Sequence, residues 1–207
     1  MVTVFILDEK CNLACEFCIC NGEKRLSSEE IKNKLNSCSG TVIFTGGEPL
    51  LREDINELCA YAKSKELRVG VHTNAILLSR LDLKNVDFVN LPLDGPKEIH
   101  DKMRGRSFEF IIKALDKLKE KKNNIRITTI VTKINLNYII NIPKILEDHN
   151  IELWRVFKYK GNQDKFIISQ EEFDQLKNIK TDCKIEFIDD IDNFGKWEKV
   201  SVLRKLD

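Results

Sequence analysis

Short runs of aliphatic and β-branched residues alternate along the chain with longer stretches in which apolar residues recur every three or four positions. The short runs have the pattern of buried strands, and the longer stretches have that of amphipathic helices. The pattern predicts strands over residues 2–7, 41–45, 67–73, 86–93, 125–132 and 151–157. It predicts helices from Ser27 or Ser28 onward, around 55–62, and over 77–81, 107–122, 136–148 and 170–178. Residues 183–206 have the weaker pattern of one or two further strands.

This alternation indicates right-handed βαβ units and therefore a parallel sheet. A complete barrel of eight such units needs about 250 residues, whereas this chain has 207. We therefore expect an α/β fold, an incomplete TIM-like (βα)6 barrel over residues 1–180, with a short C-terminal extension, 181–207, that packs on it. In such folds the chemistry gathers at the carboxyl ends of the strands. Cys11, Gly46, Asn74 and Asp94 all follow predicted strands.

Composition narrows the class of protein further. Hydrophobic residues make up 42% of the chain, which is enough for a core and too much for a disordered segment. The formal net charge of +1 argues against a general nucleic-acid or acidic-membrane binder. The apolar run at residues 2–7 is too short for a signal peptide or a membrane span. We therefore expect a cytoplasmic protein with reduced thiols and with neither nucleic acid nor a membrane as its partner.

Three of the seven cysteines, Cys11, Cys15 and Cys18, form a C-x3-C-x2-C pattern directly after the first predicted strand. The same spacing would also place three small apolar side chains on one helix face. A zinc site is a second alternative, although structural zinc commonly has four ligands. Three thiolates from one loop suit a [4Fe–4S] cluster with one iron open to another ligand. Of the remaining cysteines, Cys59 is expected in the core and Cys20 as a spare thiol near the cluster.

Two motifs make the sequence resemble the radical SAM superfamily. The first is the cysteine pattern with an aromatic residue, Phe17, just before its last cysteine, and the second is the run Gly46-Gly47-Glu48-Pro49 after the second predicted strand. The resemblance covers roughly residues 1–160. It implies that the three cysteines hold a [4Fe–4S] cluster whose fourth iron binds S-adenosylmethionine. It further implies an enzyme that cleaves this cofactor to a 5′-deoxyadenosyl radical, which abstracts hydrogen from a substrate.

The resemblance also implies cofactor contacts for Gly46, Gly47, Glu48 and Pro49, with Glu48 and the loop backbone meeting the methionine ammonium group. Glycines suit this position because they permit backbone angles and a close ligand approach that a Cβ would forbid. Outside this context, a Gly-Gly pair would be an ordinary turn. The prediction therefore rests on the pairing of this loop with the cysteine loop.

Two later strand ends are further candidates for cofactor contacts. Thr73-Asn74 resembles the Thr-Asn-Gly pattern of the superfamily, although Ala75 replaces the glycine, and Asp94 resembles a position that often reaches the cofactor ribose. The simpler alternative for each is a turn at the end of a strand. Arg104 lies in a stretch similar to one that follows this strand in several radical SAM groups; its alternative is a solvated loop cation worth little energy.

Of the properties considered, the substrate is the one that the sequence determines least. The segments 154–158 and 166–173 are similar to a region of viperin-like enzymes, which dehydrate a nucleoside triphosphate. By this resemblance Arg126 and Arg155 would bind the substrate anion; the alternative is that each pairs with a carboxylate at the barrel rim. No catalytic side chain is assigned. We expect a small-molecule substrate or a protein one, and an electron donor such as flavodoxin or ferredoxin.

Two other functions stay open at this point. An activating enzyme for a glycyl-radical protein would be similarly small, but it would need an exposed groove for its protein substrate. An iron–sulfur electron carrier or redox sensor would share the cluster. The Gly-Gly-Glu-Pro run argues against such a carrier, which needs no site for methionine and normally uses four cysteines.

Overall fold

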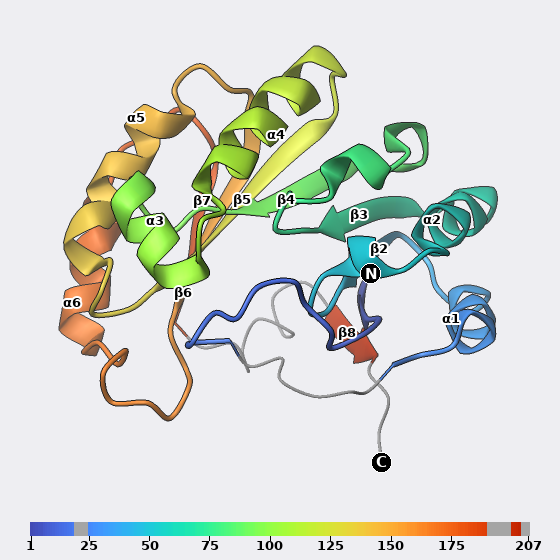
Figure 1. The fold of residues 1–207 in the computed structure, drawn as a ribbon, viewed down its shortest axis with the longest axis horizontal. Coiled ribbons are helices and arrows are strands. Elements are labelled where there is room, and N and C mark those ends of the chain that lie inside the picture. The colour runs from blue at the N-terminus through green and yellow to red at the C-terminus, as the bar shows by residue number, and fades with distance from the viewer. Residues whose placement is uncertain (19–24, 190–199, 204–207) are drawn as a thin grey trace.

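The structure is a computed structural model that describes residues 1–18, 25–189 and 200–203 (Figure 1). The strands are β1 (Val2–Ile6), β2 (Thr41–Thr45), β3 (Arg68–His72), β4 (Phe88–Pro92), β5 (Asn124–Val131), β6 (Ile151–Lys158), β7 (Ile185–Ile188) and β8 (Val200–Leu203). The α-helices are α1 (Ser28–Leu35), α2 (Ile55–Ser64), α3 (Lys97–Arg104), α4 (Phe108–Glu120), α5 (Ile142–Leu146) and α6 (Gln170–Gln175). Short 3-10 helices are η1 (Pro49–Leu51), η2 (Leu78–Arg80), η3 (Leu83–Asn85), η4 (Leu136–Asn141) and η5 (Leu176–Asn178).

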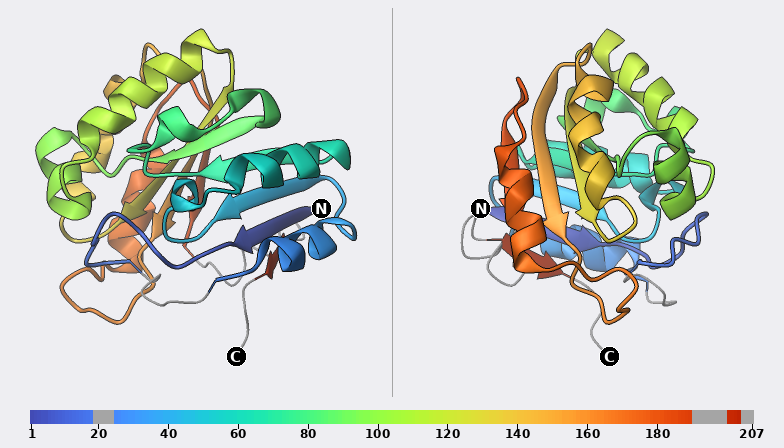
Figure 2. Two further views of the ribbon diagram at one scale, coloured as in Figure 1. Left: turned by 45° about the vertical axis from the view of Figure 1, so that its right-hand side comes forward. Right: turned by 90° about the vertical axis from the view of Figure 1, so that its left-hand side faces the viewer.

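The strands form one sheet in the order β7-β6-β5-β4-β3-β2-β1-β8, and every neighbouring pair is parallel. The sheet curls without closing, and β7 and β8 are its two edges in the described part of the chain (Figure 2). The predicted incomplete α/β barrel is thus confirmed, and each of the six predicted strands is present. Residues 181–207 supply β7 and β8, which extend the sheet at opposite edges.

Helices cover the outer face of the sheet. Figure 1 shows α1 and α2 beside β1–β3, and α3–α6 beside β4–β7. Fully buried strand residues such as Phe44 and Ile127 pack with helix residues such as Leu58 and Leu115 in the main core. Because side chains alternate along a strand, the neighbours of Ile127 face the other way. The inner face of the sheet therefore carries a separate set of side chains, which is more polar than the core.

Two segments differ from the prediction. Residues 97–104, treated as part of a loop, form α3, which starts directly after Pro96; a proline suits a helix start because the N–H it lacks has no partner there. His100 and Met103 of α3 are buried. The helix predicted over 136–148 is divided into η4 and α5, with Pro143 in the first turn of α5. This proline lies next to the boundary between the two helices.

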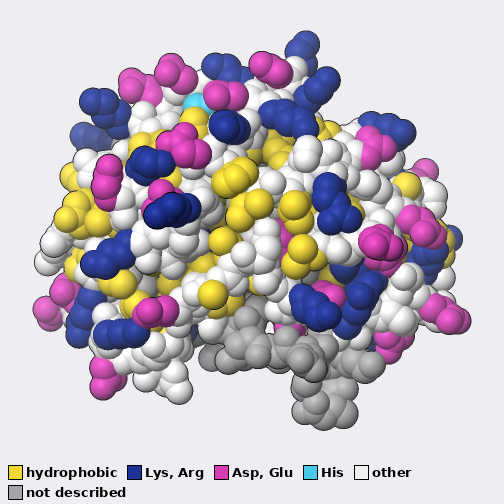
Figure 3. Space-filling model, viewed as in Figure 1, with side chains coloured by type: hydrophobic (Ala, Val, Ile, Leu, Met, Phe, Trp, Pro, Cys, Tyr) yellow, Lys and Arg dark blue, Asp and Glu magenta, His cyan; other side chains and the backbone are white. Residues whose placement is uncertain are grey.

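The surface carries charges of both signs. On the face shown in Figure 3, acidic and basic side chains are interspersed, in keeping with the nearly balanced charge of the sequence. In the described part of the chain, no helix is both long and apolar enough to cross a membrane.

Candidate active site

The predicted cluster-binding cysteines lie in the loop between β1 and α1, which crosses from β1 toward α3 (Figure 1). The start of this loop is fixed against the loop after β2. The Gly47 N–H donates to the Asp8 carbonyl at 2.7 Å, and the Glu48 N–H donates to the Lys10 carbonyl at 2.8 Å. A Cβ on Gly46 or Gly47 would lie 2.1 Å from the same two carbonyl oxygens. The glycine pair thus permits the close approach of two loops, whereas the sequence indicated close approach of a ligand.

The three thiols differ in their surroundings. Cys11 and Cys18 are exposed, and Cys15 is half-buried. The Cys11 sulfur accepts hydrogen bonds from the Leu13 N–H at 3.4 Å and from Asn74 Nδ2 at 3.8 Å. Burial raises the pKa of the Cys15 thiol to about 11, and the Arg104 charge opposes this rise. The pKa of Cys11 is also raised by burial, so the donors on Cys11 and the charge beside Cys15 reduce these rises without cancelling them.

The three thiols do not form a closed site for a single metal ion in the described structure. The described residues contain no group of three His, Cys, Asp or Glu side chains gathered closely enough for one metal ion. A zinc ion would need its ligands to converge on one point. An iron–sulfur cluster places each thiolate on a different iron, so its ligands stand farther apart.

Glu48 is buried and links the segment after β2 to the segment after β3 by hydrogen bonds. Its Oε1 accepts hydrogen bonds from the Leu50 N–H at 2.9 Å and the Thr73 hydroxyl at 2.8 Å, and its Oε2 accepts one from the Asn74 N–H at 2.8 Å. Burial raises the pKa of Glu48, although these hydrogen bonds oppose the shift. Glu48 therefore holds Asn74 in place, and Asn74 in turn contacts the cysteine loop at Asn12 and Cys11.

Asp94 is fully buried, and both of its carboxylate oxygens are engaged. Oδ1 accepts a hydrogen bond from the Ile130 N–H at 2.8 Å, and Oδ2 pairs with the Arg104 guanidinium. That guanidinium lies over the Phe17 ring, 4.9 Å from its centroid. The structure thus places the Arg104 side chain, rather than the Asp94 carboxylate, beside the cysteine loop. For Arg104 the sequence left open a solvated cation in a loop. Arg104 is instead the last residue of α3 and pairs with the buried Asp94, so that alternative is wrong.

One cavity of about 180 Å³ joins these parts. Of the residues that the sequence singled out, it is lined by Cys11, Cys15, Cys18, Gly46, Gly47, Asn74 and Arg104. Glu48, Pro49 and Asp94 are not among its lining residues and lie one layer behind it. The polar lining residues that the sequence did not single out include Thr45, His72, Asn90 and Thr128 on the inner face of β2–β5. The alternation of side chains along each strand is the sequence signal that could have predicted their place on the inner face.

Arg126 and Arg155 both lie on the inner face of the sheet and both pair with carboxylates. Arg126 makes two hydrogen bonds of 3.0 Å to Glu152, near the amino ends of β5 and β6. Arg155 pairs with Glu186 at 2.9 Å. Neither arginine lines the cavity. These contacts agree with the alternative stated above, in which each arginine pairs with a carboxylate at the barrel rim. Cys20, expected near the cluster, lies outside the described residues.

Comparison with known proteins defines the class. A sequence profile of the Radical SAM superfamily matches residues 6–146, so the chain belongs to this superfamily. A Fe-coproporphyrin III synthase of Methanosarcina barkeri is 32% identical over 166 residues, which is 72% of this chain and 42% of that protein. An S-adenosylmethionine-dependent nucleotide dehydratase of Flammeovirga pacifica is 28% identical over 205 residues, 84% of this chain and 70% of that protein.

The fold agrees with this assignment. The crystal structure of Streptococcus suis SuiB bound to S-adenosylmethionine superposes with a TM-score of 0.74 at 16% identity, over 96% of this chain and 52% of SuiB. The chain spans less than half the length of the Methanosarcina relative. The cofactors of the superfamily to which the chain belongs are a [4Fe–4S] cluster and S-adenosylmethionine. The three thiols, the donors on Cys11 and the Arg104 charge fit this pair of cofactors.

Proposed function

We propose that this radical SAM enzyme acts on a small anionic substrate, with a nucleotide as the first candidate. In this proposal Cys11, Cys15 and Cys18 hold the cluster. When bound, the cluster and S-adenosylmethionine supply a 5′-deoxyadenosyl radical that abstracts hydrogen from the substrate. Asn74 and the backbone of Gly46 and Gly47 form one wall of the cofactor site.

Glu48, Pro49 and Asp94 keep a role one layer behind the cofactor in this proposal. Glu48 fixes Asn74, Pro49 starts η1 at the end of the loop, and Asp94 fixes Arg104. The Arg104 guanidinium supplies a positive charge that suits the carboxylate of the methionine moiety. In this proposal Glu48 and Asp94 support the residues that contact the cofactor, because both carboxylates are buried and do not line the cavity.

The observation that carries the proposal is the shared cavity. Its upper wall is the cysteine loop, and its floor is the inner face of the sheet. The residues that would hold the cofactors and the residues that could hold a substrate therefore line one cavity. Such proximity is what the chemistry of these cofactors would require.

Two observations bear on the substrate. Arg126 and Arg155 lie on the inner face of the sheet, and cations there suit an anionic group, although each pairs with a carboxylate in the described structure. The nucleotide dehydratase of Flammeovirga is matched over 70% of its length, so a nucleotide is the first candidate.

The test is anaerobic reconstitution with iron and sulfide, followed by reduction with dithionite in place of the electron donor. The reduced protein should release 5′-deoxyadenosine and methionine from S-adenosylmethionine, slowly without substrate and faster with the right nucleoside triphosphate. With a substrate deuterated at the reacting carbon, the 5′-deoxyadenosine should carry deuterium. A cluster that forms and is reduced but never cleaves the cofactor would contradict the proposal and favour an electron carrier. Stimulation by a protein alone would favour an activating enzyme.

A further inference from the structure

A row of neutral polar side chains crosses the floor of the cavity. Thr45, His72, Asn90 and Thr128 come from four adjacent strands, β2 to β5, and all four line the cavity. His72 is opposite Asn90 in the ladder between β3 and β4. The Thr128 hydroxyl donates to the Asn90 side-chain oxygen at 3.0 Å. The floor beneath the cysteine loop thus offers hydrogen-bonding groups without charge.

The row continues into charged residues on the next two strands. Thr128 is opposite Arg155 of β6, and Arg155 is opposite Glu186 of β7. The Arg155 guanidinium pairs with Glu186, which also pairs with Lys184. The row therefore changes from neutral polar side chains on β2–β5 to ion-paired side chains on β6 and β7.

His72 has hydrogen-bonding capacity that the protein does not use. Its side chain faces the cavity, and the described residues give its ring no hydrogen-bond partner. Burial, together with the charges of Arg155 and Arg126, lowers the pKa of His72 to about 3, so the ring is neutral. A neutral imidazole has one donor nitrogen and one acceptor nitrogen. Polar groups in such surroundings are normally satisfied by protein, water or ligand, which here leaves water or a ligand in the cavity.

We propose that His72 binds the substrate by hydrogen bonds to a hydroxyl or carbonyl group. The inference rests on the proposed function only in taking the floor of the cavity as the substrate site. It defines the substrate class by chemistry: a small molecule that carries a hydroxyl or carbonyl group. A nucleotide, with its ribose hydroxyls, is one member of that class.

The experiment compares two substitutions at position 72 in the reconstituted, cofactor-loaded enzyme. His72→Phe keeps a planar ring without hydrogen bonds, and His72→Gln keeps a donor and an acceptor. His149→Gln is the matched control, because His149 pairs with Asp116 of α4 and lies outside the cavity. Isothermal titration uses three sets of probes: the ribonucleoside triphosphates, the nucleosides without phosphate, and citrate as a hydroxycarboxylate. Affinity for S-adenosylmethionine is measured separately for each variant.

For the probe that binds the wild type most tightly, His72→Phe should weaken binding about tenfold or more, the usual effect of losing a buried hydrogen bond. His72→Gln should lose less, and His149→Gln should match the wild type. Equal affinity of wild type and His72→Phe would overturn the inference, as would a loss confined to S-adenosylmethionine. If only citrate binds, the nucleotide proposal fails while His72 is still judged on citrate. If no probe binds the wild type, both proposals are overturned.

Discussion

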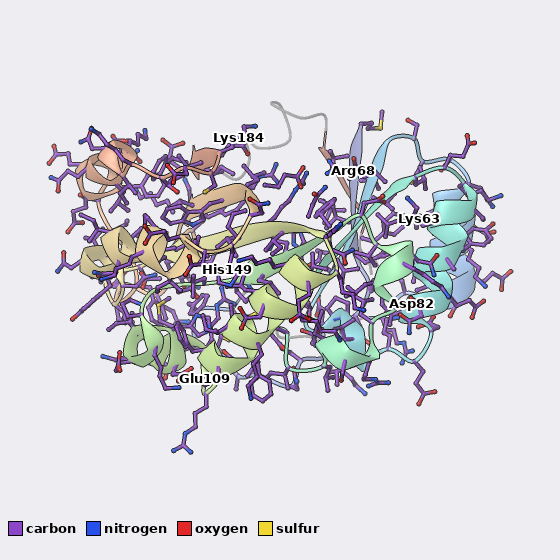
Figure 4. All side chains as sticks on the ribbon, turned by 90° about the horizontal axis from the view of Figure 1, so that it is seen from above. Lys63, Arg68, Asp82, Glu109, His149 and Lys184 are labelled. Atoms are coloured by element: carbon purple, nitrogen blue, oxygen red, sulfur yellow. The ribbon has the colours of Figure 1, made fainter. Side chains whose placement is uncertain are left out.

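Polar side chains on the inner face of the sheet have different surroundings near the amino ends of the strands and near their carboxyl ends. Near the amino ends of the strands, Glu152 pairs with both Arg68 and Arg126, and the Arg126 guanidinium lies 3.8 Å from the centroid of the Phe88 ring. Arg68, at the start of β3, is labelled in Figure 4. Near the carboxyl ends, the thiols, Asn74 and His72 face a cavity instead.

The difference separates structural from functional polar groups. Polar groups that satisfy one another are already paired, so their removal costs stability. Polar groups that face a cavity keep their capacity for a ligand, so their removal costs binding. Glu48 connects the two roles, because it is buried like the first set and positions Asn74, a member of the second. The substitutions below test this separation.

The largest effect is expected at the cysteine loop. Replacing Cys11, Cys15 or Cys18 by Ser should abolish or severely reduce iron binding, because a hard hydroxyl replaces a soft thiolate. Iron and sulfide analysis after anaerobic reconstitution measures this. Cys59→Ser, in the core, and Cys20→Ser should keep iron near the wild-type level. If Cys20→Ser loses as much iron as Cys15→Ser, the ligand assignment is wrong.

Glu48→Ala should lower both the stability of the fold and the affinity for S-adenosylmethionine. It leaves the buried donors of Leu50, Thr73 and Asn74 without their acceptor, at a cost of about 3 kcal/mol in the free energy of unfolding. Because Asn74 loses its support, affinity for S-adenosylmethionine should fall by about tenfold. Urea unfolding and cofactor titration measure the two effects, and the cluster absorbance should persist. Loss of stability with unchanged cofactor affinity would show that Glu48 does not act on the cofactor site.

Arg155→Ala tests whether an arginine that pairs with a carboxylate also binds the substrate. We expect the apparent Kd of the bound nucleoside triphosphate to rise about tenfold, equivalent to about 1.4 kcal/mol, with cofactor affinity unchanged. Isothermal titration into the cofactor-loaded protein is the measurement, with Arg80→Ala, in η2, as a control arginine outside the cavity. An unchanged Kd would mean that Arg155 serves only its pairing with Glu186.

Glu152→Gln tests the ion pairs near the amino ends of the strands and should have the smallest effect of these substitutions. The Glu152 side chain is 32% exposed, so the substitution should lower the free energy of unfolding by only about 1 kcal/mol at neutral pH. Partial burial acts to raise the pKa of Glu152, but the hydrogen bonds and charges of Arg126 and Arg68 outweigh it and lower the pKa to about 2.

Because the folded-state pKa is lowered, the stabilisation by Glu152 is present above its ordinary pKa of 4.5 and is lost as the pH falls through about 2. The difference between wild type and Glu152→Gln in urea unfolding should therefore shrink over this interval. Cofactor cleavage should match the wild type. A difference that stays constant with pH, or a loss of cofactor cleavage, would contradict the separation of the two ends.

Local sequence determined the strands and the motif loops of this protein. Six buried strands, the cysteine loop after the first and the Gly-Gly-Glu-Pro run after the second follow from hydrophobic runs and from residue types with few alternatives. Parallel strands place such loops at one edge of the sheet whatever the details of packing. The superfamily and its cofactors could therefore be inferred from the sequence.

Only the tertiary structure decided which polar residues meet. The pairing of Arg126 with Glu152 depends on an irregularity between β5 and β6, where the register shifts at Ile125 and Arg126. The Phe88 ring beside Arg126 occupies space that any Cβ on Gly70 would fill, 2.0 Å from the ring. The position of Arg104 depends on α3 and on Asp94, and the row from Thr45 to Arg155 depends on the register of five strands. Periodicity fixes which face of a strand a residue is on, but its partners across the sheet come from contacts distant in sequence.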